Sequence, residues 1–162
     1  MDAPDQLNPI TRDNPTMAEN INEDTWYWSL KIGDACRIAD EFIQQGEIDP
    51  GFIHLLGYDE WPTRMGVMVV LEDIFERQPD LIPRIIPGVK AMLSHAEENV
   101  RGDAACLLGM VGDGTIALEL ENMMTEAGPE LREVIVDALQ MIRDRDGQQP
   151  ARDFRPASNK AM

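Results

Sequence analysis

The chain has 162 residues, of which 43% are hydrophobic, and this is enough to form one domain with a sizeable core. Asp and Glu outnumber Lys and Arg by 30 to 14, which gives a formal net charge of −16 at pH 7. A field of that sign repels nucleic-acid phosphates and anionic lipid headgroups, so we expect no nucleic acid and no membrane among the binding partners. A basic partner fits this charge better, and so does simple solubility, for which a solvated acidic surface is the simpler interpretation.

The sequence also bears on the cellular compartment. The first residues are acidic and polar, unlike a secretory signal, and apolar stretches such as residues 104–111 are far shorter than the ~20 residues that span a bilayer. We therefore expect a cytoplasmic protein.

Cys36 and Cys106 each lie in an apolar helical pattern without a second Cys at CxxC spacing. Two buried, reduced thiols are the simplest interpretation.

Residues 1–23 are expected to form a disordered N-terminal arm. Prolines recur there among Asp, Asn and Thr, with too few apolar residues to offset the entropy of ordering. Trp26, Tyr27 and Trp28 follow this arm, and they have two interpretations. Either the rings cover the exposed end of a helical stack, or they form an aromatic patch that binds a partner.

Apolar residues then recur at helical spacing in seven segments that Gly, Pro or Asp separate. We predict helices over residues 30–45, 50–56, 62–77, 80–93, 99–111, 115–126 and 129–145. Pro87 removes a hydrogen bond inside the fourth of them, so this helix should kink or restart there. Asp113 or Thr115 should cap the sixth by accepting hydrogen bonds from its free backbone N–H groups. Residues 146–162 are expected to be a disordered tail.

Three of the predicted helices begin with a similar pattern. Residues 62–67, 99–104 and 130–135 match by residue type, and each contains an arginine near its start: Arg64, Arg101 and Arg132. The spacings between these arginines are 37 and 31 residues, which is typical of repeats built from helix pairs. A single helical hairpin cannot bury its own apolar stripe, so stacked hairpins would form the core. We therefore predict an all-α fold.

The segment from Val100 to Asp113, V-R-G-D-A-A-C-L-L-G-M-V-G-D, resembles the HEAT-like repeats, including the short bacterial form first described in phycobilisome lyases. The resemblance covers residues 61–143 well and extends weakly to about residue 30. It implies an α–α superhelix over residues 24–145, a stack of antiparallel helix pairs with about seven helices. In that family the arginine at the helix start binds carbonyls or an Asp of the adjoining unit. The resemblance thus implies structural roles for Arg64, Arg101, Asp103, Asp113 and Arg132.

A narrower likeness concerns residues 61–70. They look like the C-terminal part of bacterial proteins in which a thioredoxin-like domain precedes HEAT-like repeats. This chain has no CxxC motif, and its N-terminal part is too short for a thioredoxin fold. No redox activity is implied for the chain itself, and a separately encoded redox protein is a candidate partner.

Sequence motifs for catalysis are absent. The HEAT-like deoxyhypusine hydroxylases hold a di-iron centre with repeated His-Glu dipeptides, and none occurs here. His95 with Glu97 and Glu98 has the residue types for weak binding of a divalent cation, but a turn of this kind is usually only solvated. No G-x-S-x-G motif occurs, and the glycine-rich residues 109–114 lack the Lys of a phosphate-binding loop. We expect no catalytic residue, no metal site and no bound cofactor, and hence no enzymatic activity.

The sequence predicts a binding face on the fourth and sixth predicted helices, and we expect these two helices to lie side by side. This face should be acidic, and its candidate contacts are Glu119, Glu121, Asn122 and Glu126, with Trp26 and Trp28 as further candidates. The principal hypothesis is an adaptor that docks a basic protein there. The alternatives are an accessory subunit or lyase-like factor for a cofactor-bearing or redox partner protein, and a purely structural oligomerisation unit.

The methionines leave one further point open. Seven of the ten lie in predicted helices, which is typical of core packing, although a Met-rich surface also suits an adaptable binding groove. These seven are Met65, Met68, Met92, Met110, Met123, Met124 and Met141.

Overall fold

The computed structural model describes residues 15–148, with side chains from residue 22 to residue 147. Its helices are α1 (Pro15–Lys31), α2 (Ala35–Gln45), η1 (Pro50–Gly57), α3 (Trp61–Arg77), η2 (Pro79–Arg84), α4 (Ile86–Met92), α5 (Glu98–Val111), α6 (Gly114–Met123) and α7 (Pro129–Gln148). The elements η1 and η2 are 3₁₀-helices. No strand occurs within residues 15–148, which confirms the predicted all-α class for this part of the chain.

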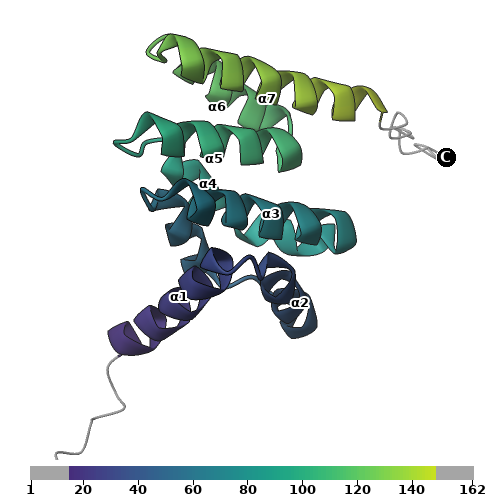
Figure 1. Cartoon of the computed structure of the whole chain (residues 1–162). Coiled ribbons are helices and arrows are strands. Elements are labelled where there is room, and N and C mark those ends of the chain that lie inside the picture. The colour runs from purple at the N-terminus through teal and green to yellow at the C-terminus, as the bar shows by residue number, and fades with distance from the viewer. Residues whose placement is uncertain (1–14, 149–162) are drawn as a thin grey trace, which may run out of the picture.

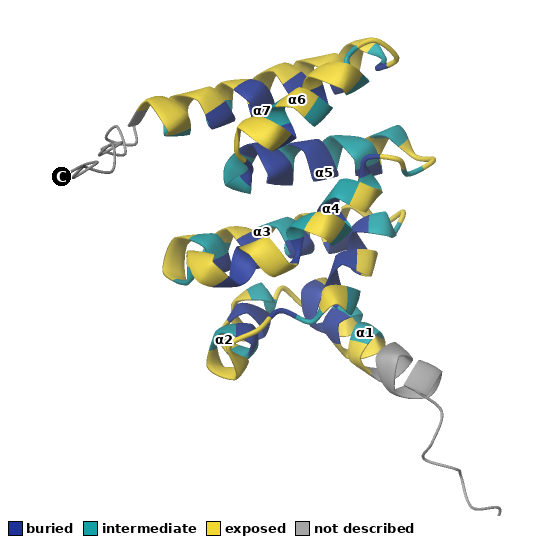
Figure 2. Ribbon diagram, turned by 180° about the vertical axis from the view of Figure 1, so that it is seen from behind, coloured by how far each residue is buried: buried dark blue, intermediate teal, exposed yellow. Residues whose placement is uncertain are grey.

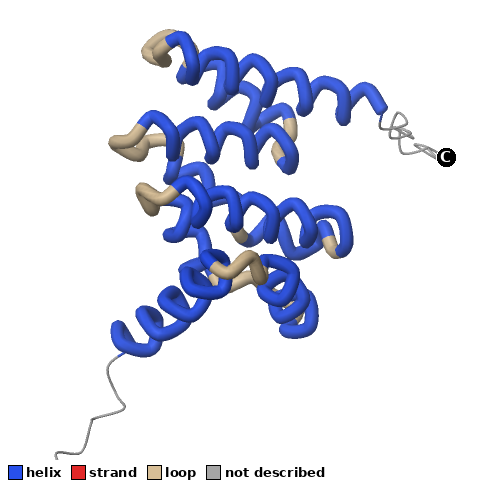
Figure 3. The backbone as a smooth tube through the Cα atoms, in the orientation of Figure 1, coloured by secondary structure: helices blue, strands red, loops and turns tan. Residues whose placement is uncertain are grey.

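The helices form layers that are stacked along one direction (Figure 1). The helices α3, α5 and α7 lie one above another and begin at the same edge of the stack, while α4 and α6 lie behind them (Figures 1 and 3). At the other end of the stack from α7, α1 and α2 diverge below α3. The most extensive helix contact is between α5 and α7, and α3 approaches α5 at fewer positions. On this face α5 is therefore flanked by α3 and α7.

The ends of the helices follow from residues with specific turn chemistry. The Asp49 side chain caps η1, because its Oδ1 accepts a hydrogen bond from the Gly51 backbone N at 2.8 Å. Gly46 ends α2 with a φ of 75°, in the left-handed region that favours glycine. The predicted restart at Pro87 is confirmed, since η2 ends before it and α4 begins with Pro87 in its first turn. A proline there removes no helical hydrogen bond.

The helix predicted over residues 30–45 is instead two helices. Gly33, with a φ of 81°, separates α1 from α2, and the apolar periodicity alone did not reveal this break. The helix α1 begins at Pro15, inside the segment that the sequence predicted as a disordered arm. Residues 1–14 and 149–162, which hold the rest of the predicted arm and most of the predicted tail, lie outside the described part of the chain.

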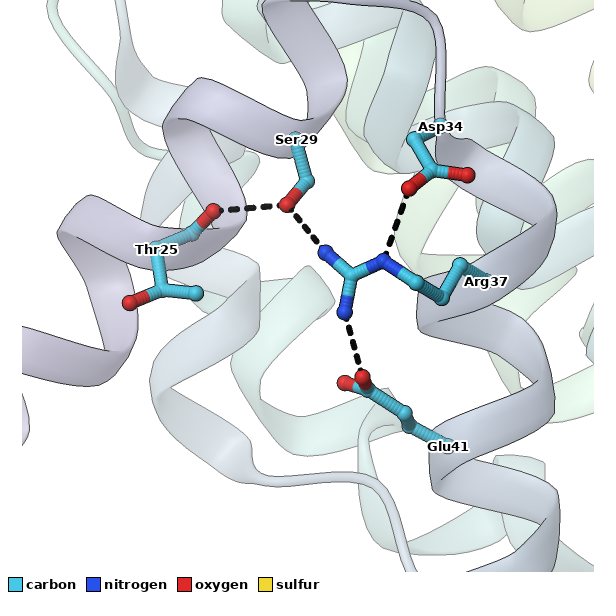
Figure 4. A network of polar contacts seen from close by, with 5 residues as sticks. All are labelled: Thr25, Ser29, Asp34, Arg37 and Glu41. Carbon is cyan, nitrogen blue, oxygen red and sulfur yellow. Dashed lines mark hydrogen bonds and ion pairs between the residues drawn. The ribbon is translucent and has the colours of Figure 1, made fainter.

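Arg37 joins the end of α1 to the start of α2 (Figure 4). Its Nε donates to Asp34 Oδ2 at 2.7 Å and its Nη2 to Ser29 Oγ at 2.5 Å, and its Nη1 pairs with Glu41. Ser29 Oγ in turn donates to the carbonyl oxygen of Thr25 at 2.8 Å. The hydrogen bond with Asp34, and next the charge of Glu41, raise the pKa of Arg37 above its ordinary value. This network ties the two helices together across their turn.

One contiguous apolar core runs through the stack. In Figure 2 the buried positions follow the inner sides of the helices, and the exposed positions cover the outer side of α7. Most residues of the stripes predicted for α5 and α7 are buried, as Ala104, Leu108, Ile135 and Leu139 show, while Val111 and Val134 are partly buried. Each layer covers the apolar stripe of its neighbour, and this removal of apolar surface from water is the main force that stabilises the stack.

The two tryptophans of the Trp26-Tyr27-Trp28 segment have different environments. Trp26 is buried, with its ring centroid 5.7 Å from that of Phe42 and 5.5 Å from that of Phe52. Trp26 is therefore a core residue at the end of the stack, as the first interpretation has it, and it offers no surface to a partner. Trp28 is 64% exposed and stays a candidate contact.

The prediction of two buried thiols is wrong for Cys36. This thiol is exposed, because the buried face of α2 is formed by Ile38, Ala39 and Phe42 and is centred away from it. Cys106 is partly buried, and both thiols are free.

Asp113 is the N-cap residue of α6, one of the two candidates that the sequence offered. Its Oδ1 accepts a hydrogen bond from the Thr115 hydroxyl at 2.6 Å, from the Thr115 backbone N at 2.9 Å and from the Ile116 backbone N at 3.4 Å. These bonds, that of the Thr115 hydroxyl first, lower the pKa of Asp113 below its ordinary value of 3.8. The ionised carboxylate therefore stabilises the start of α6.

Replacing Asp113 with Ala should lower the free energy of unfolding by about 1 kcal/mol near neutral pH, and replacing it with Asn, which also caps helices, should cost much less. Because the folded-state pKa is depressed, the contribution of the charge is fully present above 3.8 and is lost as the pH falls through the folded-state pKa. Urea unfolding of the three proteins at several pH values measures this. An Asp113→Ala variant as stable as the parent at neutral pH would contradict the assignment of the cap.

Candidate functional site

An elongated groove runs over α5 between α3 and α7. Its first part has a volume of about 430 Å³ and is lined by all three helices. A second part of about 450 Å³ shares Met141 with the first and continues toward the C-terminal ends of the helices. We call the two parts together the α5 groove, with a floor on α5 (Gly102, Cys106, Met110) and walls on α3 (Trp61, Met65, Phe75) and α7 (Val134, Met141).

Helical spacing explains how three helices line one groove. The lining residues on α3 include positions 61, 65, 68 and 72, and those on α7 include positions 130, 134, 137 and 141. Both sets follow the spacing i, i+4, i+7, i+11, which keeps side chains on one side of a helix. The stripes that form the core lie on another side of the same helices. On α3 and on α7, one side of the helix therefore packs into the core and another side lines the α5 groove.

The lining of the α5 groove is rich in large apolar side chains that remain in contact with water. Trp61 is 61% exposed and Met65 is 37% exposed. Four of the seven helical methionines line the groove: Met65, Met68, Met110 and Met141. None of the seven belongs to the fully buried core of the described residues. Met65 and Met141 belong to the groove alone, whereas Met68 and Met110 line the groove and also pack against the core.

Carboxylates surround this apolar lining. Glu98, Asp103, Glu130 and Asp137 line the first part of the groove, and Glu72, Glu76 and Asp144 line the second. The arginines among the lining residues are Arg64 and Arg145, and both are engaged with oxygen atoms of the protein. The groove therefore combines an apolar floor with a negative rim, and this rim attracts cationic groups.

Arg64 ties α3 to α5 at one wall of the groove. Its Nε donates to Asp103 Oδ2 at 2.7 Å, and its Nη1 donates to the carbonyl oxygens of Tyr58 at 3.2 Å and Asp59 at 2.8 Å. Only 7% of the Arg64 side chain is exposed, against 26% of that of Asp103. These are the kinds of contact that the resemblance implied for a structural arginine: carbonyls and an Asp of the adjoining helix.

The two other arginines of the repeated pattern make related contacts. Nη1 of Arg101 donates to the carbonyl oxygens of His95 at 2.7 Å and Ala96 at 2.8 Å. These carbonyls lie six and five residues before the arginine, which are the same offsets as those of the two carbonyls that bind Arg64. Arg132 Nε donates at 3.0 Å to one carbonyl in the connection before α7. All three arginines thus fix the chain that leads into their own helix.

Sequence reasoning missed the role of Arg145. Its guanidinium donates to the carbonyl oxygens of Gly109, at 3.2 Å, of Met110 and of Gly112 at the end of α5. A cation at the C-terminus of a helix satisfies its last carbonyls and interacts favourably with the helix dipole. Arg145 therefore holds α7 against α5, and nothing in the local sequence pattern pointed to a partner 33 to 36 residues away.

The acidic face predicted on α4 and α6 is partly neutralised. Its candidates were Glu119, Glu121, Asn122 and Glu126. Lys90 Nζ on α4 lies 2.5 Å from Glu119 Oε1 on α6, and Arg143 Nη2 on α7 lies 3.8 Å from Glu121 Oε1. Asn122 and Glu126 are exposed. Binding at this face stays a prediction, and the α5 groove offers a larger set of carboxylates together with apolar surface.

The sequence analysis did not single out Trp61, the most exposed aromatic side chain of the groove. It included the residue only as the first residue of the segments that carry the resemblances, and it considered Trp26 and Trp28 as candidate contacts instead. The available signal was a second apolar stripe on α3 at positions 61, 65 and 68, beside the stripe of the core. A helix that is apolar on two sides has more than one surface to cover.

Cys106 places a thiol in the floor of the α5 groove. Burial first, and then the charges of Asp103, Glu72 and Asp137, raise the pKa of the Cys106 thiol, so it is protonated near neutral pH and is a poor nucleophile. Within the described residues, no group of three or more His, Cys, Asp or Glu side chains is placed to hold a metal ion. His95, which the sequence analysis considered together with Glu97 and Glu98, is not among the lining residues of the α5 groove. Its Nδ1 accepts a hydrogen bond from the Glu97 backbone N at 3.1 Å.

No protein-family model, no curated protein and no solved structure matches this chain. Between residues 15 and 148, no helix has both the length and the apolar content that crossing a bilayer requires.

Proposed function

We propose that this chain is a non-catalytic protein-interaction module of the HEAT-like type and that it binds its partner in the α5 groove. The observation that carries the proposal is the exposed apolar lining, with Trp61 and Met65 at the wall and two adjoining pockets along the helices. A partner that covers this lining gains about 25 cal/mol for each Å² of apolar surface removed from water. Aromatic residues and methionines are also enriched at protein interfaces.

The HEAT-like part of the proposal is supported by the arginines at the helix starts. Arg64 and Arg101 bind carbonyls at the same two offsets, although 37 residues separate them. Their helices, α3 and α5, occupy equivalent places in successive layers (Figure 1). Such agreement is expected when one hairpin unit is repeated along a stack.

A photo-cross-linking experiment tests the proposed binding site. A benzophenone amino acid replaces either Met65 in the α5 groove or Leu118 on α6, which is 61% exposed and lies on the helix that the sequence analysis favoured. We expect a discrete cross-linked protein from an extract of the native cells with the label at position 65 and none with the label at position 118. Cross-linking only at position 118 would move the binding face to α6.

The same experiment bears on the role in the cell. A captured partner that carries a pigment, a metal or a redox centre would make the chain an accessory factor for that protein. No captured protein at position 65, in an extract that contains the parent protein, would contradict a binding role for the groove.

A further inference from the structure

We infer that the occupant of the α5 groove is a basic amphipathic α-helix of a partner protein. This inference rests on the proposed function and adds the shape and charge of the ligand. Four features of the groove support it: its length, the state of the backbone around it, its apolar lining and its rim of carboxylates.

The length of the groove suits a short helix. Its lining on α5 extends from Glu98 to Met110, which at a rise of 1.5 Å per residue corresponds to roughly 18 Å. A ligand helix laid along α5 would therefore be covered over about twelve residues, or three turns. The walls on α3 and α7 run beside α5 over a similar distance, so the ligand would replace water along the whole of this face.

The backbone around the groove favours a helical ligand over an extended one. The groove is built from three helices, whose backbone N–H and C=O groups are used within the helices. The described residues contain no strand, so they offer no sheet edge to which an extended peptide could add. A peptide covered by apolar walls must satisfy its backbone groups itself, and a helix does so.

The lining sets the side chains that the ligand needs. Met65, Val134 and Met141 present apolar groups along the two walls, and these would receive a stripe at positions i, i+3, i+4 and i+7 of the ligand. Methionine side chains are unbranched and adapt to different partners. The groove thus selects an apolar stripe at helical spacing and not one particular residue.

The rim sets the charge of the ligand. Three carboxylates lie beside the apolar lining of the first part: Glu98 on α5, and Glu130 and Asp137 on α7. Glu98 pairs with Arg101 at 3.4 Å. Within the described residues, Glu130 and Asp137 form no ion pair. Lysines or arginines that flank the apolar stripe of the ligand would reach these carboxylates. The charge complementarity would also speed association and make binding depend on salt.

Two other occupants fit the groove less well. A second copy of the chain carries the same net charge of −16, so its approach is opposed by repulsion. Residues 149–162 of the same chain are basic, with Arg152, Arg155 and Lys160 against Asp153. Their large apolar residues are few, however, and Pro156 disfavours a continuous helical stripe.

The experiment measures binding of designed peptides to the full chain by calorimetry. The probe is a peptide of about eighteen residues in which Leu recurs at helical spacing and Lys fills the other positions, and its control is a scrambled peptide of the same composition. We expect the amphipathic peptide to bind at least about tenfold more tightly than the scrambled one, and an analogue with Glu in place of Lys not to bind.

Matched charge reversals locate the site. Glu130→Lys with Asp137→Lys should weaken binding of the Lys/Leu peptide at least about tenfold, while Glu119→Lys with Glu121→Lys, an equal change in net charge on α6, should change it less than about twofold. Equal effects of the two pairs, or equal binding of the scrambled peptide, would overturn the inference.

Further outcomes separate this inference from the proposed function. A protein captured at position 65 together with no binding of the Lys/Leu peptide would overturn the basic helix and leave the protein-binding role intact. A rise in peptide affinity of about tenfold or more when Arg152, Arg155 and Lys160 are changed to Ser would identify the chain's own C-terminal residues as the occupant. Dimers that the Lys/Leu peptide dissociates would identify a second copy, and either result would overturn the assignment to a partner.

Discussion

Replacing Arg64 with Ala should lower the free energy of unfolding by roughly 3 kcal/mol, the largest effect that we expect from a single polar residue of this chain. The substitution removes an almost buried guanidinium that donates to Asp103 and to two backbone carbonyls. It leaves the carboxylate of Asp103 without its partner in a partly buried place, and it removes the packing of the arginine side chain. Urea unfolding followed by far-UV circular dichroism measures the change.

Two further substitutions show whether the expected loss of stability is specific to the contacts of Arg64. Arg132 makes one hydrogen bond, at 3.0 Å to a carbonyl, and is exposed, so Arg132→Ala should cost about 1 kcal/mol or less. Arg64→Lys keeps the charge but loses the planar fork that reaches several acceptors at once, so its cost should be intermediate. If Arg64→Ala and Arg132→Ala are equally mild, Arg64 does not hold the wall of the α5 groove.

Replacing Gly109 with Ala should destabilise the stack by about 2 kcal/mol, although alanine favours a helix over glycine by up to about 1 kcal/mol. A Cβ atom on Gly109 would lie 2.7 Å from the Cα and 2.8 Å from the Cβ of Ala138 on α7. The Cα atom is part of the backbone of α7 and the Cβ atom is bonded directly to it, so a side-chain rotation cannot relieve the overlap. The helices α5 and α7 must therefore move apart. The measurement is again equilibrium unfolding in urea.

Gly102, on the same helix, is the matched control. A Cβ atom there would meet only Leu131, at 3.9 Å, which is ordinary contact, so Gly102→Ala should stabilise the protein by about 0.5 to 1 kcal/mol. The two substitutions therefore have opposite expected signs. A stabilising Gly109→Ala would mean that α5 and α7 are not in close contact.

The contrast between these two glycines shows where sequence reasoning stops. Gly102 and Gly109 both lie in the helical pattern of residues 99–111, and the pattern treats them alike. Only the position of α7 makes one of them a contact between helix backbones and the other part of an open groove. The same holds for Arg145, whose acceptors at the end of α5 lie far away in the sequence.

The methionines and tryptophans make the same point for the candidate site. The sequence allowed two roles for the methionines, core packing and the lining of a groove, and both occur in the structure. Met65 and Met141 line the α5 groove, and Met92 and Met123 pack against the core. Burial decides between such roles, and it depends on which neighbour covers which side of a helix. Trp26 and Trp28 are only two residues apart, yet one is buried and the other exposed.

The sequence by itself determined the all-α class, the positions of most helices and the residues that stop or cap them, because spacing and turn chemistry act over a few residues and need no partner. It missed the turn at Gly33, since the apolar periodicity continues on both sides of it. Only the tertiary structure decided that α3 and α7 flank α5 and leave an acidic, methionine-lined groove between them. The reason is that a groove arises from the spacing of separate helices, and this spacing is set by contacts such as Gly109 with Ala138 and Arg64 with Asp103, between residues 29 and 39 positions apart.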